Sequence, residues 1–491
     1  MTGTVLPAAT TDACPVETAG SLVAAGRNIS LPFRLRVERG DKTVELTFVR
    51  ILRLLPGKRI VAVCEVGGDE CLVKAYLGRS AHRYAGRERR GIGLLQESGV
   101  RTATLRWQGR LTDGHGQILA FDYLRDAISL QDRWEHADQR EARVDVLTRA
   151  MVILGKLHNH GVVQDDIHLA NFLLSGGMLY TIDGGHIVRR SSPPLREPAS
   201  LENLGTFFAQ FFPRFDDFIQ IVLPAYEAVR GWPSDPVRLR RLARAVFRSR
   251  EKRKKTYISK AFRDCTRFIC NADFRRFEVC ERDAYSKDLA KLLDDPDAAM
   301  GRGKLLKDGR TSTVALVRLP ERSLVIKRYN MKSPWHRIRR AFRRTRAWTS
   351  WANACRMEFL GIPSVKPIAL IEERFGPLRG RAWFITEYVE GQDALACLRS
   401  LKNPNGELEA LTRILAGLSE SRISHGDLKA TNFVMTERGP VILDLDAMRE
   451  HRSNEAFRRA FQRDLDRFMQ NWTDRPELAT RFEGLIGHLT P

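Results

Sequence analysis

Two stretches of this chain repeat one arrangement of side chains that suits phosphoryl transfer. Each has an Asp, an Asn five positions later, an apolar run, a short turn, and a second apolar run that ends in Asp. In such a transfer one carboxylate meets the acceptor hydroxyl, while an amide oxygen and a second carboxylate hold a magnesium ion. Mg²⁺ prefers oxygen ligands and keeps several waters, so few side chains suffice. The residues are Asp166, Asn171 and Asp183 in the first copy and Asp427, Asn432 and Asp444 in the second.

Chance is the competing explanation for each copy taken alone. Asp and Asn are common turn residues, and Asp-x4-Asn pairs arise often without any chemistry. Here each copy follows a helical pattern, precedes a hairpin pattern, and has a lysine upstream at a matching place. That order is typical of a kinase catalytic loop and its metal-binding strand. The repetition therefore favours an α+β protein with two tandem kinase-like, bilobal modules.

In the first module, the segment LVKAY ends a predicted strand and places Lys74 like the lysine of a V-A-I-K strand. Glu88, near the start of the following helical stretch, is its predicted ion-pair partner. The turn at Gly57 has a single glycine and is not a G-x-G-x-x-G loop, so an ordinary hairpin turn is the alternative there. Lys58 or Arg59 in this turn are candidates to face phosphates. The predicted ATP-binding residues of this module are Gly57, Lys58, Lys74, Glu88, Tyr123 and Leu124, the last two in a hinge.

The second module repeats this order with one part missing. Strand and turn patterns place Lys327 like Lys74, and the closing helix puts Asp464 where a kinase anchors its catalytic loop. The stretch between Arg322 and Glu358 has no acidic residue, so Lys327 lacks an obvious helical partner. It either uses another partner or belongs to a catalytically impaired module. The predicted ATP-binding residues are Gly309, Lys327, Tyr388 and Val389.

The whole chain has 491 residues and a formal net charge of +22, which favours polyanionic partners. Eight scattered cysteines form no zinc spacing, and the sequence has neither a membrane-length apolar run nor a secretory signal. We expect disorder over residues 1–30, one module over residues 31–290, a linker over residues 291–303, and a second module over residues 304–491. The segment from residue 205 to 290 reads as helical and basic.

An arginine-rich segment, KSPWHRIRRAFRRTRAW, precedes the second catalytic loop. On a helix it makes a cationic face with tryptophan anchors, which suits an anionic membrane surface. RNA is the competing partner, because arginine and tryptophan stack on bases. The predicted contacts to substrate or an anionic surface are Arg337, Arg340 and Arg344.

At these residues the sequence resembles the bacterial lipopolysaccharide core kinases, including the inner-core heptose kinases and InaA-type proteins. The segments VIKRYN, GIPSVKPIAL, ITEYVEG, HGDLKATNFV and ILDLDAM carry the resemblance over about residues 300–470. The first module is a more remote match over about residues 30–215, through LVKAYL, DDIHLANFLL and IDGG. Gln164 and Asp165 stand before Asp166 where the pattern has His-Arg or His-Gly, and neither module has D-F-G.

The resemblance implies a protein-kinase-like fold, ATP and Mg²⁺, and phosphorylation of heptose hydroxyls of the lipopolysaccharide core at the cytoplasmic membrane face. It implies that Asp166 and Asp427 are the catalytic bases, that Lys74 and Lys327 bind ATP, and that Asn171, Asp183, Asn432 and Asp444 hold metal. The implied partners are core lipopolysaccharide, the anionic inner membrane and lipopolysaccharide-assembly proteins.

Two other functions stay open at this point. One is a pseudokinase scaffold in which at least the second module binds without chemistry, because the helix glutamate is missing there. The other is a RIO-like kinase with an RNA-linked role, although nucleic acid is the less favoured partner. The short segment from Asp183 to Glu202 has no A-P-E motif, which disfavours a protein-substrate kinase.

Overall fold

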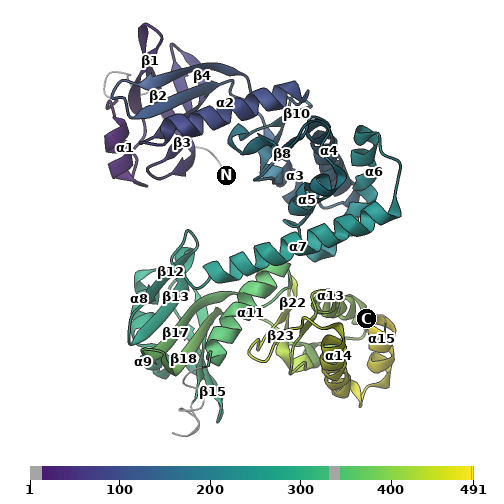
Figure 1. Ribbon diagram of the computed structural model, residues 1–491. Helices are drawn as coiled ribbons and strands as arrows, with labels where there is room; N and C mark the ends of the chain where they lie inside the picture. Colours follow the sequence, from purple (N-terminus) through teal and green to yellow (C-terminus); the bar gives the residue numbers. More distant parts are fainter. Residues whose placement is uncertain (1–13, 331–342, 488, 490–491) are drawn as a thin grey trace. The chain divides into compact units, whose positions relative to one another are not determined.

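The computed structural model describes residues 14–330, 343–487 and 489. The chain forms two compact units, of which unit one comprises residues up to 210 and residues 217–249. Unit two comprises residues 211–216 and 250–491. Helix α7 (Pro236–Lys260) begins in unit one and ends in unit two. Within each unit a strand-rich part comes first in the chain and a helix-rich part follows it (Figure 1). The α+β class predicted from the sequence is confirmed.

The strand-rich part of unit one is a closed antiparallel barrel in the order β1-β2-β3-β4-β6-β5. Its alternating apolar residues, such as Leu35, Phe48 and Val73, fill the interior and are fully buried. Helix α2 packs outside the barrel through Ala85 and Ile92. The strands are β1 (Phe33–Arg39), β2 (Lys42–Leu55), β3 (Arg59–Val66), β4 (Asp69–Leu77), β5 (Leu105–Leu111) and β6 (Gly116–Phe121), and the helix is α2 (Ala81–Glu97).

The helix-rich part of unit one surrounds the first candidate catalytic loop. The long helix α4 packs on α6, and the loop follows it directly. The helices are α3 (Leu130–Glu135), α4 (Arg140–Asn159), α5 (Glu197–Phe208) and α6 (Phe218–Arg230). The short strands are β7 (Ile128–Ser129), β8 (Val162–Gln164), β9 (Phe172–Ser175), β10 (Met178–Thr181) and β11 (Ile187–Arg189).

Unit two is built on one antiparallel sheet in the order β12-β13-β17-β18-β16-β15-β14. One face packs against α8 and α9 through Leu289, Leu293 and Met300, and the other against α11 through Trp351 and Cys355. The strands are β12 (Phe268–Ala272), β13 (Arg276–Glu281), β14 (Lys304–Asp308), β15 (Ser312–Arg318), β16 (Ser323–Tyr329), β17 (Pro367–Phe375) and β18 (Leu378–Glu387). The helices are α8 (Lys287–Asp294), α9 (Pro296–Arg302) and α11 (Arg346–Leu360).

The helix-rich part of unit two holds the second candidate catalytic loop between α13 and α14. A core of aromatic side chains, including Phe461, Phe468 and Trp472, joins the last helices to the loop. The helices are α12 (Ala394–Ser400), α13 (Asn405–Glu420), α14 (Asn454–Met469) and α15 (Pro476–Ile486). The short strands are β19 (Gln392–Asp393), β20 (Ile423–Ser424), β21 (Phe433–Thr436), β22 (Gly439–Ile442) and β23 (Arg449–Glu450).

Disorder was expected over residues 1–30, of which residues 1–13 lie outside the described residues, and the described part contains a helix. Residues 19–25 form helix α1 (Ala19–Ala25), which begins with a capping box between Thr18 and Ser21. Leu22 is buried against the end of the barrel, and the Ala19 N–H donates to Asp113 Oδ2 at 2.6 Å. A short amphipathic helix among small residues has little periodicity for sequence reasoning to detect.

The boundary between the units also differs from the linker expected at residues 291–303. Strands β12 and β13 lie in the segment that reads as helical, and β13 pairs with β17 of unit two. The acidic and glycine-containing segment forms helix α9, whose Ala299 and Met300 are buried against the unit-two sheet. Composition suggested a linker, whereas Pro296 at the first helical turn and the Asp295 side chain, which accepts from Ala298 N–H, start a helix.

Among the described residues no helix combines the length and the apolar character needed to cross a membrane.

Candidate active site

In unit one a lysine on a strand meets a carboxylate on a helix. Lys74 of β4 bonds to Glu88 of α2, and its Nζ lies 3.5 Å from Asp183 Oδ1. Glu88 is 2% exposed and also accepts from Tyr76 OH at 3.2 Å and from the backbone N–H groups of Gly184 at 3.1 Å and the following residue at 2.9 Å. One carboxylate therefore ties the strand, the helix and the loop together, and the ion pair expected from the sequence is present.

The first catalytic loop is held by hydrogen bonds between its own residues. Asn171 Nδ2 donates to the Asp166 carbonyl at 2.7 Å, and Ile182 N–H donates to the Asn171 carbonyl at 2.9 Å. Because the amide nitrogen is used inside the loop, Asn171 Oδ1 is the atom suited to a metal. Asp183 has a left-handed backbone (φ 66°), a conformation that non-glycine residues adopt at a cost.

A cavity of about 390 Å³ opens beside these residues in unit one. Its lining includes Lys74, Glu88, Asn171, Asp183 and the predicted hinge residues Tyr123 and Leu124. Gly57 and Lys58 are not among the lining residues: Gly57 lies near Val23 of α1, and the Lys58 carbonyl accepts from Leu77 N–H. Of the turn residues predicted to bind ATP, Gly57 and Lys58 therefore lie outside the lining of this cavity.

Arg59, the other cation of this turn predicted from the sequence to face phosphates, is the first residue of β3 and lines the cavity. Its Nη1 lies 3.3 Å from Asp183 Oδ1, and Arg53 lies 4.0 Å from the same carboxylate. Burial opposes ionisation of Asp183, but the charges of Lys74 and Arg59 outweigh it and hold the pKa of this carboxyl below its ordinary value. The carboxylate predicted to hold metal is thus surrounded by cations.

In unit two the strand lysine meets carboxylates of the loop. Lys327 Nζ bonds to Asp444 Oδ1 at 2.5 Å and lies 3.6 Å from Asp446 Oδ2. Burial disfavours the ammonium, yet Tyr329 and the two aspartates raise the pKa of Lys327 above its ordinary value. Glu358 does not serve this lysine, because it pairs with Arg267 at 2.7 Å. Sequence reasoning missed Asp446 as a partner, although the run Asp-Leu-Asp was visible.

The second catalytic loop repeats the bonds of the first. Asn432 Nδ2 donates to the Asp427 carbonyl at 2.8 Å, and Leu443 N–H donates to the Asn432 carbonyl at 2.7 Å. Asp444 again has a left-handed backbone (φ 53°). The two loops thus share a hydrogen-bond pattern and a backbone conformation, although their side chains differ at several positions.

Two cationic side chains contact the carboxylate of Asp427, the candidate base of unit two. Lys429 Nζ and Arg467 Nη1 each lie 3.0 Å from its carboxylate. Asp464 accepts from the backbone N–H groups of His425 at 2.6 Å and Gly426 at 2.9 Å, as expected for an anchor of this loop. Neither Lys429 nor Arg467 was singled out from the sequence, although Lys429 stands two positions after the candidate base.

Unit one carries different residues at the matching positions, counted from Asp166 and Asp427. Asn203 stands where unit two has Asp464, and its Nδ2 donates to the Gln164 carbonyl at 3.0 Å. Gln164 stands at the place of His425, is fully buried, and has no hydrogen-bond partner for either side-chain polar atom. His168 takes the place of Lys429 and lies 3.9 Å from Asp166.

His158 of α4 supports the unit-one loop through Asn203. Its Nε2 lies 3.0 Å from Asn203 Oδ1 and its Nδ1 lies 2.8 Å from Tyr226 OH. Burial, with a contribution from Arg230, lowers the pKa of His158 to about 4, although the bond to Asn203 acts in the opposite direction. The imidazole is neutral at pH 7, with Nε2–H donating to Asn203.

This burial predicts a loss of unit-one stability in mild acid. The folded-state pKa lies below the ordinary value, so between pH 6.5 and 4 the unfolded chain binds a proton that the folded chain does not. Stability should therefore fall by about 3 kcal/mol as pH decreases across this window. Chemical denaturation between pH 7 and pH 4 measures it, comparing His158→Gln with a control, His160→Gln. An unchanged pH slope in His158→Gln would contradict the assignment.

Of the remaining residues predicted from the sequence to bind ATP or an anionic surface, those that the structure describes contact partners other than the lysine and aspartates of unit two. Tyr388 and Val389 follow β18, and Tyr388 N–H donates to the Ser323 carbonyl at 2.9 Å. Gly309 lies in the turn between β14 and β15 and donates to the Ser312 carbonyl at 3.1 Å. Arg344 is exposed and lies over the Trp348 ring at 5.8 Å. Arg337 and Arg340 lie outside the described residues.

The described residues offer few metal ligands at any one place. Within the described ranges, no group of three or more His, Cys, Asp or Glu side chains is arranged to hold a metal ion. A magnesium ion beside Asp183 and Asn171, or beside Asp444 and Asn432, would need oxygens from a bound nucleotide as well. The donor set of one carboxylate and one amide oxygen fits that requirement.

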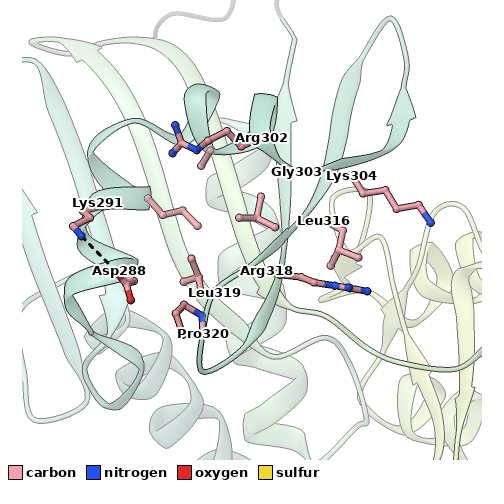
Figure 2. Close-up of a pocket in the computed structure, with 12 residues that line it drawn as sticks. Asp288, Lys291, Arg302, Gly303, Lys304, Leu316, Arg318, Leu319 and Pro320 are labelled. Atoms are coloured by element: carbon pink, nitrogen blue, oxygen red, sulfur yellow. Dashed lines mark ion pairs between the residues drawn. The ribbon is translucent and has the colours of Figure 1, made fainter.

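A second cavity, of about 610 Å³, lies in unit two beside α8, α9 and the β14–β15 pair (Figure 2). Four cationic side chains line it, and Lys291 is paired with Asp288 at 3.6 Å. It includes none of the residues assigned to the candidate active site. The cations are Lys291, Arg302, Lys304 and Arg318.

One protein-family model matches part of unit two. The model of the lipopolysaccharide kinase (Kdo/WaaP) family matches residues 302–481, a range that holds Lys327, Asp427 and Asp444. No curated protein sequence matches the chain.

Several solved structures are similar to part of the chain. WaaP in complex with acyl carrier protein is 21% identical, over 42% of this chain and 88% of that chain, with a TM-score of 0.32. Vaccinia related kinase 3 is 13% identical, over 35% of this chain and 56% of that chain, with a TM-score of 0.25. A rhoptry kinase from Toxoplasma gondii is 15% identical, over 38% and 60% of the two chains, with a TM-score of 0.28.

Proposed function

We propose that this protein is an ATP-dependent kinase with two kinase-like units, and that it phosphorylates a sugar hydroxyl of the lipopolysaccharide core. The observation that carries the proposal is the lysine, asparagine and aspartate constellation of unit two, set inside the residues that match a lipopolysaccharide kinase family. The heptose of the inner core is the acceptor implied by the resemblance. ATP is the donor that such a constellation binds.

Each residue of unit two has a role in this proposal. Lys327 contacts the nucleotide phosphates, and Asp444 with Asn432 holds the magnesium, which neutralises phosphate charge when bound. Asp427 accepts the proton of the acceptor hydroxyl. We assign to Lys429, whose Nζ lies 3.0 Å from Asp427, the role of stabilising charge on the transferred phosphoryl group.

Transfer of labelled phosphate from ATP to purified core oligosaccharide tests the proposal. The folded full-length chain should label the oligosaccharide in a magnesium-dependent reaction. Labelling of neither heptose-containing core nor intact lipopolysaccharide, by protein that binds ATP, would contradict the acceptor and leave nucleotide binding as the function. A steep salt-dependent affinity for RNA that exceeds the affinity for anionic vesicles would instead favour the RNA-linked alternative.

A second candidate function applies to unit one, which we propose binds a nucleotide or another polyanion without chemistry. Three departures favour this role over catalysis. Arg59 contacts Asp183, Asn203 replaces the anchoring aspartate, and Gln164 precedes the candidate base without a hydrogen-bond partner for its side chain. This proposal assigns the impaired role to unit one, whereas the sequence left open either another partner for Lys327 or an impaired unit two.

Arg59 gives this second candidate a direct test. Register pairs Arg59 with Tyr76 in unit one and Ser312 with Tyr329 in unit two, so Ser312 is its counterpart. We expect Arg59→Ser, in a Lys327→Ala background, to make ATP binding more dependent on magnesium by about tenfold, because Asp183 loses a competing cation. Calorimetric titration with and without Mg²⁺ measures the change. Equal magnesium dependence in both proteins would mean that Arg59 does not compete with the metal.

The proposed setting is the cytoplasmic face of the inner membrane, where core lipopolysaccharide is the partner. The net charge of +22 supports contact with anionic lipid, at about 1 kcal/mol for each basic residue near the surface.

A further inference from the structure

Each strand lysine contacts a second carboxylate besides the metal-site aspartate, and this second carboxylate comes from different elements in the two units. In unit one it is Glu88 of helix α2. In unit two it is Asp446, which lies in the loop two residues after Asp444 and 3.6 Å from Lys327 Nζ. The Lys327 and Asp446 side chains are 18% and 17% exposed, so this pair is shielded from water.

A tyrosine on each strand shows which helix positions correspond. Tyr76 stands two residues after Lys74 and donates to Glu88 Oε2 at 3.2 Å. Tyr329 stands two residues after Lys327, and its hydroxyl lies 2.8 Å from Ser350 Oγ of α11. Ser350 therefore occupies the place of Glu88. Its hydroxyl is uncharged and cannot replace a carboxylate beside an ammonium.

The same correspondence holds one helical turn later. Gly91 follows Glu88 by three residues, and a Cβ there would lie 1.8 Å from the Gly184 carbonyl oxygen. Asn353 follows Ser350 by three residues, and its Nδ2 donates to the Leu445 carbonyl at 2.8 Å. Each contacts the residue directly after the metal-site aspartate, so helix and loop are in register in both units.

The loop position of Asp446 in unit two is occupied by a glycine in unit one. Asp183 and Asp444 share a left-handed backbone, so Gly185 corresponds to Asp446. A Cβ at Gly185 would lie 3.1 Å from Glu88 Oε2. A side chain there would point at the volume that the glutamate fills. In unit two Ser350 leaves that volume free, and Asp446 reaches the lysine.

We propose that Asp446 is the positioning residue for Lys327 in unit two, taking over from the loop the task that Glu88 performs from a helix in unit one. The inference rests on the proposed function of unit two. It accounts for the absence of a helix glutamate in unit two, because the carboxylate beside Lys327 comes from the loop and not from the helix. It also means that the lysine of unit two is positioned by the loop that carries Asp444, and not by an acid on α11.

A charge swap in the full-length chain tests this proposal. In a Lys74→Ala background, which weakens the unit-one site, we expect Asp446→Gly to weaken MgATP binding at least tenfold. Adding Ser350→Glu should restore most of that loss, because the carboxylate returns from the helix. In a Lys327→Ala background, Glu88→Ser should weaken binding, and Glu88→Ser with Gly185→Asp should recover it. Asp446→Asn removes the charge while keeping the side-chain volume, and serves where Asp446→Gly folds poorly.

The outcomes separate this inference from the proposed function. Unchanged MgATP affinity in Asp446→Asn, or a double variant no better than Asp446→Gly at equal thermal stability, would overturn the role of Asp446. If the parent protein binds no nucleotide, the proposed function fails. The interaction between Lys327 and Asp446 is then tested by thermal unfolding instead. The unfolding midpoints of Lys327→Met, Asp446→Asn and their combination should then be non-additive, as for Lys74 with Glu88, and additive midpoints would overturn the inference.

Discussion

Asp427→Asn is expected to reduce kcat for phosphoryl transfer by about 10²- to 10⁴-fold, with little change in the KM for ATP. The carboxylate lies between Lys429 and Arg467, each 3.0 Å away, and its backbone carbonyl accepts from Asn432. The amide isostere keeps these positions filled but accepts no proton. The loss should therefore fall on the chemical step and not on nucleotide binding.

Asp166→Asn, measured in the same assay, shows how the units divide the work. Asp166 is 54% exposed, and its loop lacks the aspartate that anchors Asp427. We expect it to change kcat less than threefold, because unit one is proposed to bind without chemistry. Asp466→Asn, on the exposed face of α14, is the control and should behave as the parent. A large loss in Asp166→Asn together with none in Asp427→Asn would reverse the assignment.

The sequence predicted the parts of both sites that depend on local spacing. The interval from Asp to Asn, the hairpin after it, and the strand lysine are short-range patterns, and the structure brings them together in both units. Lys74 with Glu88 could also be predicted, because a helix follows the lysine strand closely. These residues lie on neighbouring elements whose order alone brings them near one another.

The other site residues and the unit boundary depend on packing between residues far apart in the sequence, which the spacing of motifs does not encode. Arg59 reaches Asp183 across 124 positions, and nothing in the turn indicates that it enters the cavity while Lys58 does not. Asp446 could have been noticed as a second acid, but its approach to Lys327 requires that Ser350 leave room. The unit boundary was misplaced because β13 pairs with β17, a partner almost a hundred residues away.

Gly91→Ala is expected to destabilise unit one by about 3 kcal/mol. Its new Cβ would lie 1.8 Å from the Gly184 carbonyl oxygen, which is backbone and cannot swing aside. Helix α2 must move away from the loop, and Glu88 then loses its bonds to Gly184 N–H and the following N–H. One buried and one half-buried N–H donor are left unpaired, so the strain extends to the lysine site.

Gly93, two residues along the same helix, provides the matched control. A Cβ there meets no atom within 4 Å, so Gly93→Ala should stabilise unit one by about 0.5–1 kcal/mol through helix propensity alone. Calorimetry of the full-length chain and hydrogen exchange in residues 81–97 and 184–186 measure both variants. Faster exchange in both segments is expected for Gly91→Ala and slower exchange in the helix for Gly93→Ala. If the two variants behave alike, the close approach of helix and loop does not hold in solution, and the glutamate that joins them cannot position Lys74 as described.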